Sequence, residues 1–282
     1  MTLPANLEAL AAAAIKDKEY TQTTEGGSFE RVLPEAGVGY ARLREYVEIG
    51  IHTHGKGAHA KDRPMARFVF ELCHKKHQQE FEKDGVKKAV PHVVAVTVPI
   101  SDNCSSDYIK IFNLLNWQGT YKHPMQALGQ PMLCTVVISD NGKEGAEKRE
   151  YVNLWKGVPK DKNWTFQPPV VVDPVNDTSK DISAAIPQLA GGDASIKVFL
   201  WLHADMAQWD SLFIEGTKTV KDKDGKEKEQ SKNWLQDKIK EAKNYAGSPI
   251  EQLLATGGEE LDLPTDAPSD ESADDILDSL GI

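Results

Sequence analysis

The stretch that decides the fold is residues 38–51, VGYARLREYVEIGI, in which apolar and polar side chains alternate. Alternate residues of a β-strand point to opposite faces of a sheet. One face of the predicted strand carries the apolar side chains of Leu43, Val47, Ile49 and Ile51. The other face carries aromatic and guanidinium groups, from Tyr40, Arg42, Arg44 and Tyr46. We therefore expect a long strand with one buried face and one solvent face.

The rest of the chain predicts further strands and a smaller number of helices. Strands are expected at residues 65–73, 92–100, 131–139, 147–156 and 195–202, and helices at 5–18, 105–117, 182–189 and 233–245. Residues 52–64 are rich in Gly, His and Lys and predict a mobile loop. Hairpin-type links dominate, which indicates a mainly β fold with antiparallel pairing and peripheral helices. An OB-type barrel of about five strands with inserted helices accommodates this pattern, and so does a sandwich.

Composition places the chain among ordinary globular proteins. Of its 282 residues, 40% are hydrophobic and 27% are charged, and no apolar run approaches the roughly 20 residues that span a bilayer. The three cysteines are scattered and odd in number, which argues against a disulfide framework. We expect a cytoplasmic protein with no membrane partner.

The negative charge is concentrated at the end of the chain. Residues 257–282 hold nine of the 43 acidic residues and no Lys or Arg, so the remainder of the chain is nearly neutral. Three regions are therefore expected: an N-terminal helix and linker (1–35), an OB-like core (36–254) and a disordered acidic tail (255–282). A neutral core leaves nucleic acid open as a partner, although the net charge is −10.

Two predicted strands carry the residue types that bind single-stranded nucleic acid. Aromatic rings stack on bases, whereas Arg and Lys neutralise phosphates. The candidate site comprises Tyr40, Arg42, Arg44 and Tyr46 on the first strand, Lys56, Lys61 and Arg63 in the loop, Arg67 on the next strand, and Arg149, Tyr151 and Trp155 on the hairpin strand. A solvated sheet face with cross-strand aromatic pairs would give the same pattern.

The tail combines like charges with apolar residues at its end. Its candidate partner-binding residues are Asp274, Asp275, Ile276, Leu277, Asp278, Leu280 and Ile282. Such a segment stays extended and orders on binding a partner. A purely solubilising tail would not need the apolar residues.

Metal chemistry is the main alternative. An apolar strand runs into His52-Thr53-His54, and several metal-dependent hydrolases and nucleases begin their site with such a strand-end pair. The chain has no Cys-x-x-Cys pair and no His-Glu-x-x-His motif to complete the ligand set. A third interpretation, a structural or adaptor protein, predicts neither metal nor DNA binding.

Several segments together resemble a known family. Residues 39–43, 47–50 and 67–72 resemble the opening of OB-fold single-stranded-DNA-binding proteins of tailed bacteriophages. Residues 128–131, 134–137 and 151–153 are similar to the central hairpin of that group, and residues 233–239 to its late helix. The tail is similar in kind to the tails of bacterial and phage single-stranded-DNA-binding proteins, but it ends in Ile282 where those end in Phe.

The resemblance implies a non-catalytic protein, without a cofactor, that coats single-stranded DNA during replication, recombination or repair. Its tail would recruit a polymerase, primase or helicase. For a phage-encoded chain, the compartment would be the host cytoplasm. The sequence leaves homo-oligomerisation and the choice between DNA and RNA open.

Overall fold

A computed structural model describes residues 33–83, 86–140, 150–153, 166–173, 175–221 and 227–257. The chain divides into two units between Leu33 and Pro34, and the fold below belongs to the second. The helix predicted at residues 5–18 and the tail from residue 258 onward lie outside the described residues.

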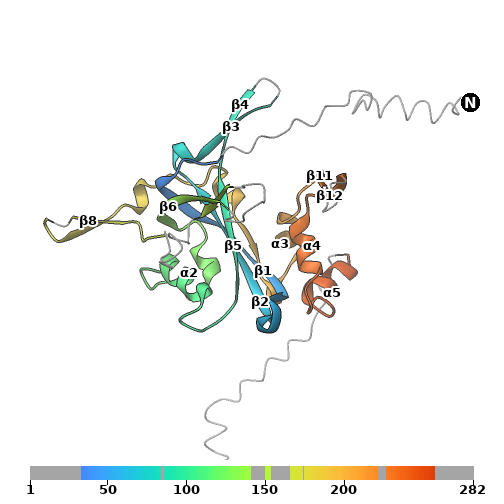
Figure 1. Cartoon of the computed structure of the whole chain (residues 1–282). Coiled ribbons are helices and arrows are strands. Elements are labelled where there is room, and N and C mark those ends of the chain that lie inside the picture. Colours follow the sequence, from blue (N-terminus) through green and yellow to red (C-terminus); the bar gives the residue numbers. More distant parts are fainter. Residues whose placement is uncertain are drawn as a thin grey trace, which may run out of the picture. The chain divides into compact units, whose positions relative to one another are not determined.

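The largest sheet contains six strands (Figure 1). These are β1 (Gly37–His54), β2 (Lys61–Leu72), β5 (Val93–Pro99), β6 (Pro131–Asp140), β7 (Glu150–Asn153) and β10 (Lys197–Phe199). Their order is β5-β2-β1-β6-β7, and every pairing along this path is antiparallel. Strand β10 adds to β1 in parallel. The expectation of a mainly β fold with antiparallel sheets and few helices is therefore confirmed.

Most strand predictions are confirmed in position, and one loop prediction is wrong. Strands β2, β5, β6 and β7 lie where strands are expected, and β10 occupies the middle of the stretch 195–202. The predicted loop at 52–64 is mostly strand, because the β1–β2 ladder continues to the pair His54↔Lys61. Backbone hydrogen bonds hold this ladder without apolar side chains, which is why the composition of the segment misled the prediction.

Three further hairpins form separate two-stranded sheets (Figure 1). They pair β3 (Gln78–Lys83) with β4 (Val86–Pro91), β8 (Val170–Asp173) with β9 (Thr178–Asp181), and β11 (Thr217–Lys221) with β12 (Glu227–Ser231). The β8–β9 hairpin lies outside the strands that the sequence analysis predicts.

The helices of the described residues are short. They are α2 (Asp107–Leu115), α3 (Met206–Ser211), α4 (Trp234–Lys240) and α5 (Pro249–Ala255). Single 3-10 turns lie at Gly57–His59, Lys75–His77, Pro124–Ala127, Ser183–Ala185, Gly192–Ser195 and Trp201–His203. The helix predicted at 182–189 is wrong, since only one such turn forms there. None of these helices has the length and apolar character that a membrane crossing requires.

A β-bulge in β1 changes which residues face the core. The pairing of β1 with β2 shifts register between Leu43 and Glu45, so Arg44 is the extra residue. The two faces of the strand exchange at this point. Ala41, Leu43 and Tyr46 consequently share one apolar core, whereas Val47 and Ile49 belong to another. The predicted alternation does not hold across Arg44, and the register of β1 with β2 shifts a second time between Glu48 and Gly50.

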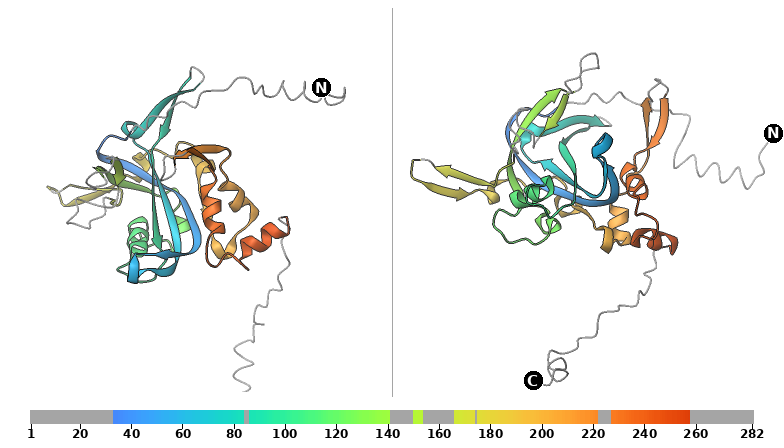
Figure 2. Two further views of the ribbon diagram at one scale, coloured as in Figure 1. Left: turned by 45° about the vertical axis from the view of Figure 1, so that its right-hand side comes forward. Right: turned by 60° about the horizontal axis from the view of Figure 1, so that its bottom comes forward.

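The two cores lie on opposite faces of the large sheet. The first is enclosed by β1, β2, β5, β6 and α2, and its largest side chains include Phe68 and Phe70. The second lies between β1–β2 and the C-terminal helices, where Trp201, Trp209 and Ile239 cover the sheet. Figure 2 shows this helical segment, coloured orange and red, beside β1 and β2.

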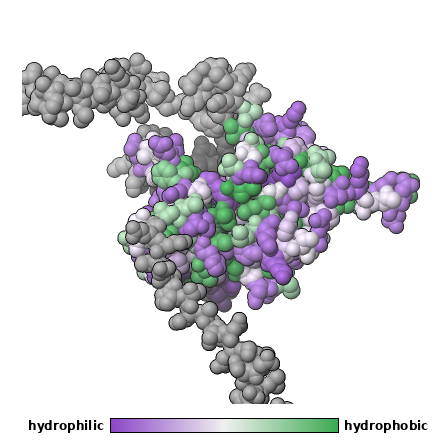
Figure 3. Space-filling view, turned by 180° about the vertical axis from the view of Figure 1, so that it is seen from behind, coloured by the Kyte–Doolittle hydropathy of each residue, from purple (hydrophilic) through white to green (hydrophobic). Residues whose placement is uncertain are grey.

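Apolar side chains also gather near the middle of the face seen in Figure 3, with hydrophilic side chains around them. The β8–β9 hairpin carries three exposed valines, Val171, Val172 and Val175. They lie outside both cores.

Candidate nucleic-acid interface

Tyr46 and Arg42 lie in the interior, so the prediction that they face solvent is wrong. Tyr46 is fully buried; its ring contacts Phe68 edge-on at 5.2 Å, and its hydroxyl donates to Glu48 Oε1 at 3.0 Å. The bulge at Arg44 turns it inward. Burial, followed by the neighbouring Tyr108 and Glu48, raises the pKa of this phenol. Tyr46 is thus a core residue and offers no surface to a base.

Arg42 holds three chain segments together. It is only 6% exposed. Its guanidinium donates to the carbonyl oxygens of Gly129 at 2.6 Å, Pro187 at 2.7 Å and Ile186 at 2.8 Å. The donors that were expected to meet phosphates are therefore occupied by backbone.

Arg44 and Arg67 are also engaged within the fold. Arg44 Nη1 lies 3.5 Å from the buried carboxylate of Glu71, and its Nε donates to the carbonyl oxygen of Ser195. The guanidinium of Arg67 lies 4.8 Å from the centre of the Trp234 ring, and burial lowers its pKa. Both cations therefore make contacts within the fold: Arg44 with Glu71 and Ser195, and Arg67 with Trp234.

The remaining predicted residues lie in separate parts of the chain. Tyr40 is half-buried at the start of β1, with its ring 5.6 Å from that of His74. Lys56, Lys61 and Arg63 are exposed at the β1–β2 hairpin. Tyr151 lies in β7, and Arg149, Trp155 and the tail residues lie outside the described residues. Along a straight strand, Tyr40 and His54 would be about 45 Å apart.

The tip of the β1–β2 hairpin has one basic face. Register pairs His52 with Arg63 and His54 with Lys61, so these four side chains lie on one face of the ladder. Asp62 lies on the other face, where Lys243 Nζ donates to its carboxylate at 2.7 and 2.8 Å. The hydrogen bond from Lys243 holds the pKa of Asp62 below its usual value. The acid of the hairpin is thus neutralised away from the basic face.

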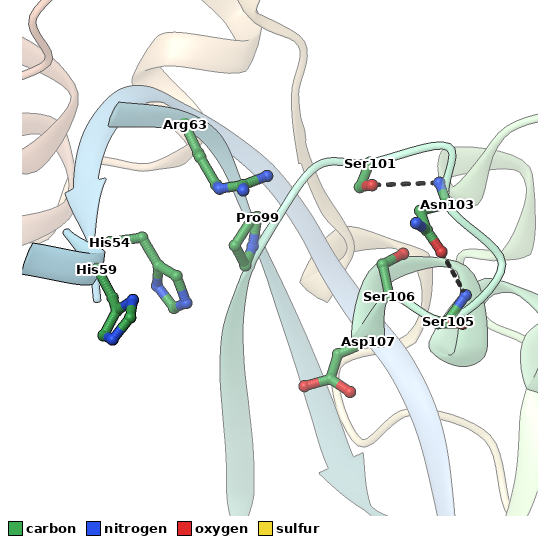
Figure 4. A pocket seen from close by; sticks show the side chains of 9 residues that line it. All are labelled: His54, His59, Arg63, Pro99, Ser101, Asn103, Ser105, Ser106 and Asp107. Carbon is green, nitrogen blue, oxygen red and sulfur yellow. Dashed lines mark hydrogen bonds between the residues drawn. The ribbon is translucent and has the colours of Figure 1, made fainter. Parts of the chain in front are cut away.

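A hollow of about 480 Å³ lies beside this basic face (Figure 4). His54, His59 and Arg63 line it from the hairpin. The opposite wall is the loop between β5 and α2 together with the first residue of α2. It carries the polar side chains of Ser101, Asn103, Ser105, Ser106 and Asp107. The imidazoles and the guanidinium thus face hydroxyl, amide and carboxylate groups across the hollow (Figure 4).

The loop wall is ordered by its own hydrogen bonds. The backbone of Ile100 donates to the carbonyl oxygen of Pro64 at 2.8 Å, which ties the loop to β2. Within the loop, the Ser105 amide donates to Asn103 Oδ1 at 2.8 Å. Ser106 Oγ accepts from the Ile109 amide and caps α2. The sequence analysis missed this wall; its only signal was the polar run 101–107 between a predicted strand and a predicted helix.

The histidines at the end of β1 were the basis of the metal hypothesis. A ring nitrogen of His52 lies 2.9 Å from the carbonyl oxygen of Ile49, and burial lowers the pKa of this imidazole. Within the described residues, no group of three or more His, Cys, Asp or Glu side chains is arranged to hold a metal ion. No observation in the described part of the chain therefore favours the hydrolase hypothesis.

Comparisons with known proteins assign no family. The chain matches no protein-family model, no curated protein and no solved structure.

Proposed function

We propose that this protein binds single-stranded DNA without sequence preference and coats it during replication, recombination or repair, as a phage-type single-stranded-DNA-binding protein. The observation that carries the proposal is the exposed basic face of the β1–β2 hairpin, with Lys61, Arg63 and nearby Lys56 outside any ion pair in the described residues. Phosphate contacts dominate such binding, and exposed cations supply them. The protein has no catalytic role in this proposal.

Tyr40, at the other end of β1, remains a stacking candidate. Tyr151 and Trp155 are stacking candidates from the sequence. An extended DNA strand is long enough to reach both the hairpin and Tyr40, whereas a small ligand is not. Stacked bases contribute about 1–3 kcal/mol each. An extended polymer can therefore contact candidate residues at both ends of β1.

The sheet order supports an OB-type barrel as the framework. Five strands follow one path, and β1 pairs with both β2 and β6 at Ala41 and Arg42. Closure would require β5 to approach β7, a pairing that is absent among the described residues. A partly open barrel is within the OB range.

The acidic tail supplies the second part of the proposal. Its charge and terminal apolar residues suit the recruitment of a polymerase, primase or helicase. It acts in the cytoplasm, which is the host cytoplasm for a phage protein.

Intrinsic fluorescence of the full chain, titrated with oligo-dT and with duplex DNA at about 50 and 300 mM salt, tests the proposal. We expect saturable quenching by oligo-dT, weaker at the higher salt. Equal or tighter binding of duplex, or no binding at the lower salt, would overturn it.

A further inference from the structure

We propose that the hollow between the β1–β2 hairpin and the loop before α2 is a subsite for one nucleotide, with the phosphate on the hairpin side and the sugar and base on the loop side. The inference rests on the proposed function in one respect, namely that the polymer supplies the nucleotide. The volume of the hollow, about 480 Å³, lies within the range of small-ligand pockets.

The charges on the two walls set the orientation of the bound unit. Arg63, His54 and His59 place the cationic and imidazole groups on the hairpin wall. Asp107 on the opposite wall would repel a phosphate. A phosphate consequently sits against Arg63, which offers a planar fork of donors.

The loop wall has the chemistry to recognise the rest of the nucleotide. Ser101 and Ser105 present hydroxyl groups, Asn103 an amide, and Asp107 a carboxylate that accepts from N–H groups of a base. Because Asn103 and Ser106 are held by backbone hydrogen bonds, the wall is ordered before a ligand arrives. Preorganised polar groups of this kind give selectivity for a unit with matching donors.

The residues around the hollow also argue against a site that binds any anion equally well. The nearest acid on the hairpin, Asp62, is bonded to Lys243 on the other face, so it does not neutralise Arg63. The hairpin wall alone would bind any anion. The loop wall, with its carboxylate, favours an anion that also carries hydrogen-bond donors.

Calorimetric titration of the full chain with dTMP, thymidine and inorganic phosphate tests the subsite. We expect dTMP to bind more tightly than either of the other two probes. Arg63→Ala should weaken dTMP binding about tenfold or more, and Lys180→Ala, an exposed cation on β9, should leave it unchanged. Failure of dTMP to bind, or binding no tighter than that of phosphate, would overturn the proposal.

The variant Asp107→Asn distinguishes two effects of this carboxylate, namely acceptance of a hydrogen bond from the base and repulsion of the phosphate. If the carboxylate accepts a donor from the base, this variant binds dTMP more weakly and phosphate at least as tightly as the original chain. Tighter binding of both probes would show that Asp107 repels the anion and accepts no donor from the base, and would overturn its assigned role in base recognition.

A parallel oligo-dT titration distinguishes failure of the subsite from failure of the proposed function. Oligo-dT binding without dTMP binding would reject the subsite alone. Binding of dTMP without oligo-dT binding would reject the coating function and leave a mononucleotide site.

Discussion

His77 is a buried titratable residue that connects stability to pH. Its side chain is fully buried, and burial, reinforced by the nearby Lys76, His74 and His92, lowers its pKa to about 4. The unfolded chain takes up this proton near the ordinary value of 6.5. The folded state is therefore at full stability above pH 6.5 and loses stability as the pH falls towards 4.

We expect the free energy of unfolding to fall by about 2–3 kcal/mol between pH 7.5 and pH 4 from this residue alone. Urea unfolding of the original chain and of His77→Gln measures it. The variant should have a smaller pH dependence, whereas His203→Gln, at an exposed position, should retain the full one. An identical pH dependence in all three chains would contradict this assignment.

The sequence analysis assigned both Arg42 and Lys61 to phosphate contacts. The structure predicts opposite effects of substitution at these two positions on stability and on DNA affinity. Arg42→Met leaves three carbonyl oxygens without their donor, which should cost about 2 kcal/mol or more of unfolding free energy. Oligo-dT affinity of the folded variant should be unchanged. Lys61→Met should leave stability unchanged and weaken binding. The reverse pattern, measured by urea unfolding and fluorescence titration, would refute the structural role of Arg42.

At the scale of elements, the C-terminal helical segment packs tightly on β1 at Gly50. This glycine has a φ of +82°, and a Cβ there would lie 2.4 Å from the Trp201 ring and 2.6 Å from Ala242 Cβ. Gly57 has a φ of +57° with open space around it. Both positions therefore strain an L side chain, but only Gly50 adds a steric clash.

Gly57→Ala should cost about 1 kcal/mol from backbone strain. Gly50→Ala should cost at least about 1–3 kcal/mol more, because the close-packed core must shift. Urea unfolding gives both values. Equal costs would mean that the helical segment does not pack on β1 as the structure shows.

Strands and helices with clear periodicity could be predicted from the sequence. Which core each face of β1 packs against could not. The strands β2, β5 and β6 and the helix α2 follow from alternation and apolar runs in the sequence. The bulge at Arg44 has no local signal, because it arises from pairing with β2. It moved Tyr46 from the predicted interface into the core.

The candidate site was predictable in its charge and not in its shape. The basic loop sequence singled out Lys56, Lys61 and Arg63, all of which are exposed. The hollow depends on the approach of residues 101–107, which follow the hairpin by about forty positions in the chain. Such a juxtaposition comes from the β2–β5 pairing and is invisible to spacing rules.

For the whole molecule, the distribution of charge decides how binding responds to salt. The acidic tail gives the chain its negative net charge, while residues 1–256 are nearly neutral. Binding of DNA therefore depends on local cations and not on the overall field. Each phosphate contact on a single strand contributes about 0.7 to the slope of log affinity against log salt.

The most direct test of the central claim is this slope for oligo-dT, measured on the full chain and on the triple variant Lys56→Ala, Lys61→Ala, Arg63→Ala. We predict weaker binding by the variant and a slope that is smaller in magnitude by up to about 2. A matched triple variant at exposed cations elsewhere, Lys110→Ala, Lys122→Ala and Lys180→Ala, should retain the original slope. Equal affinity and slope in all three chains would contradict a DNA interface at the β1–β2 hairpin.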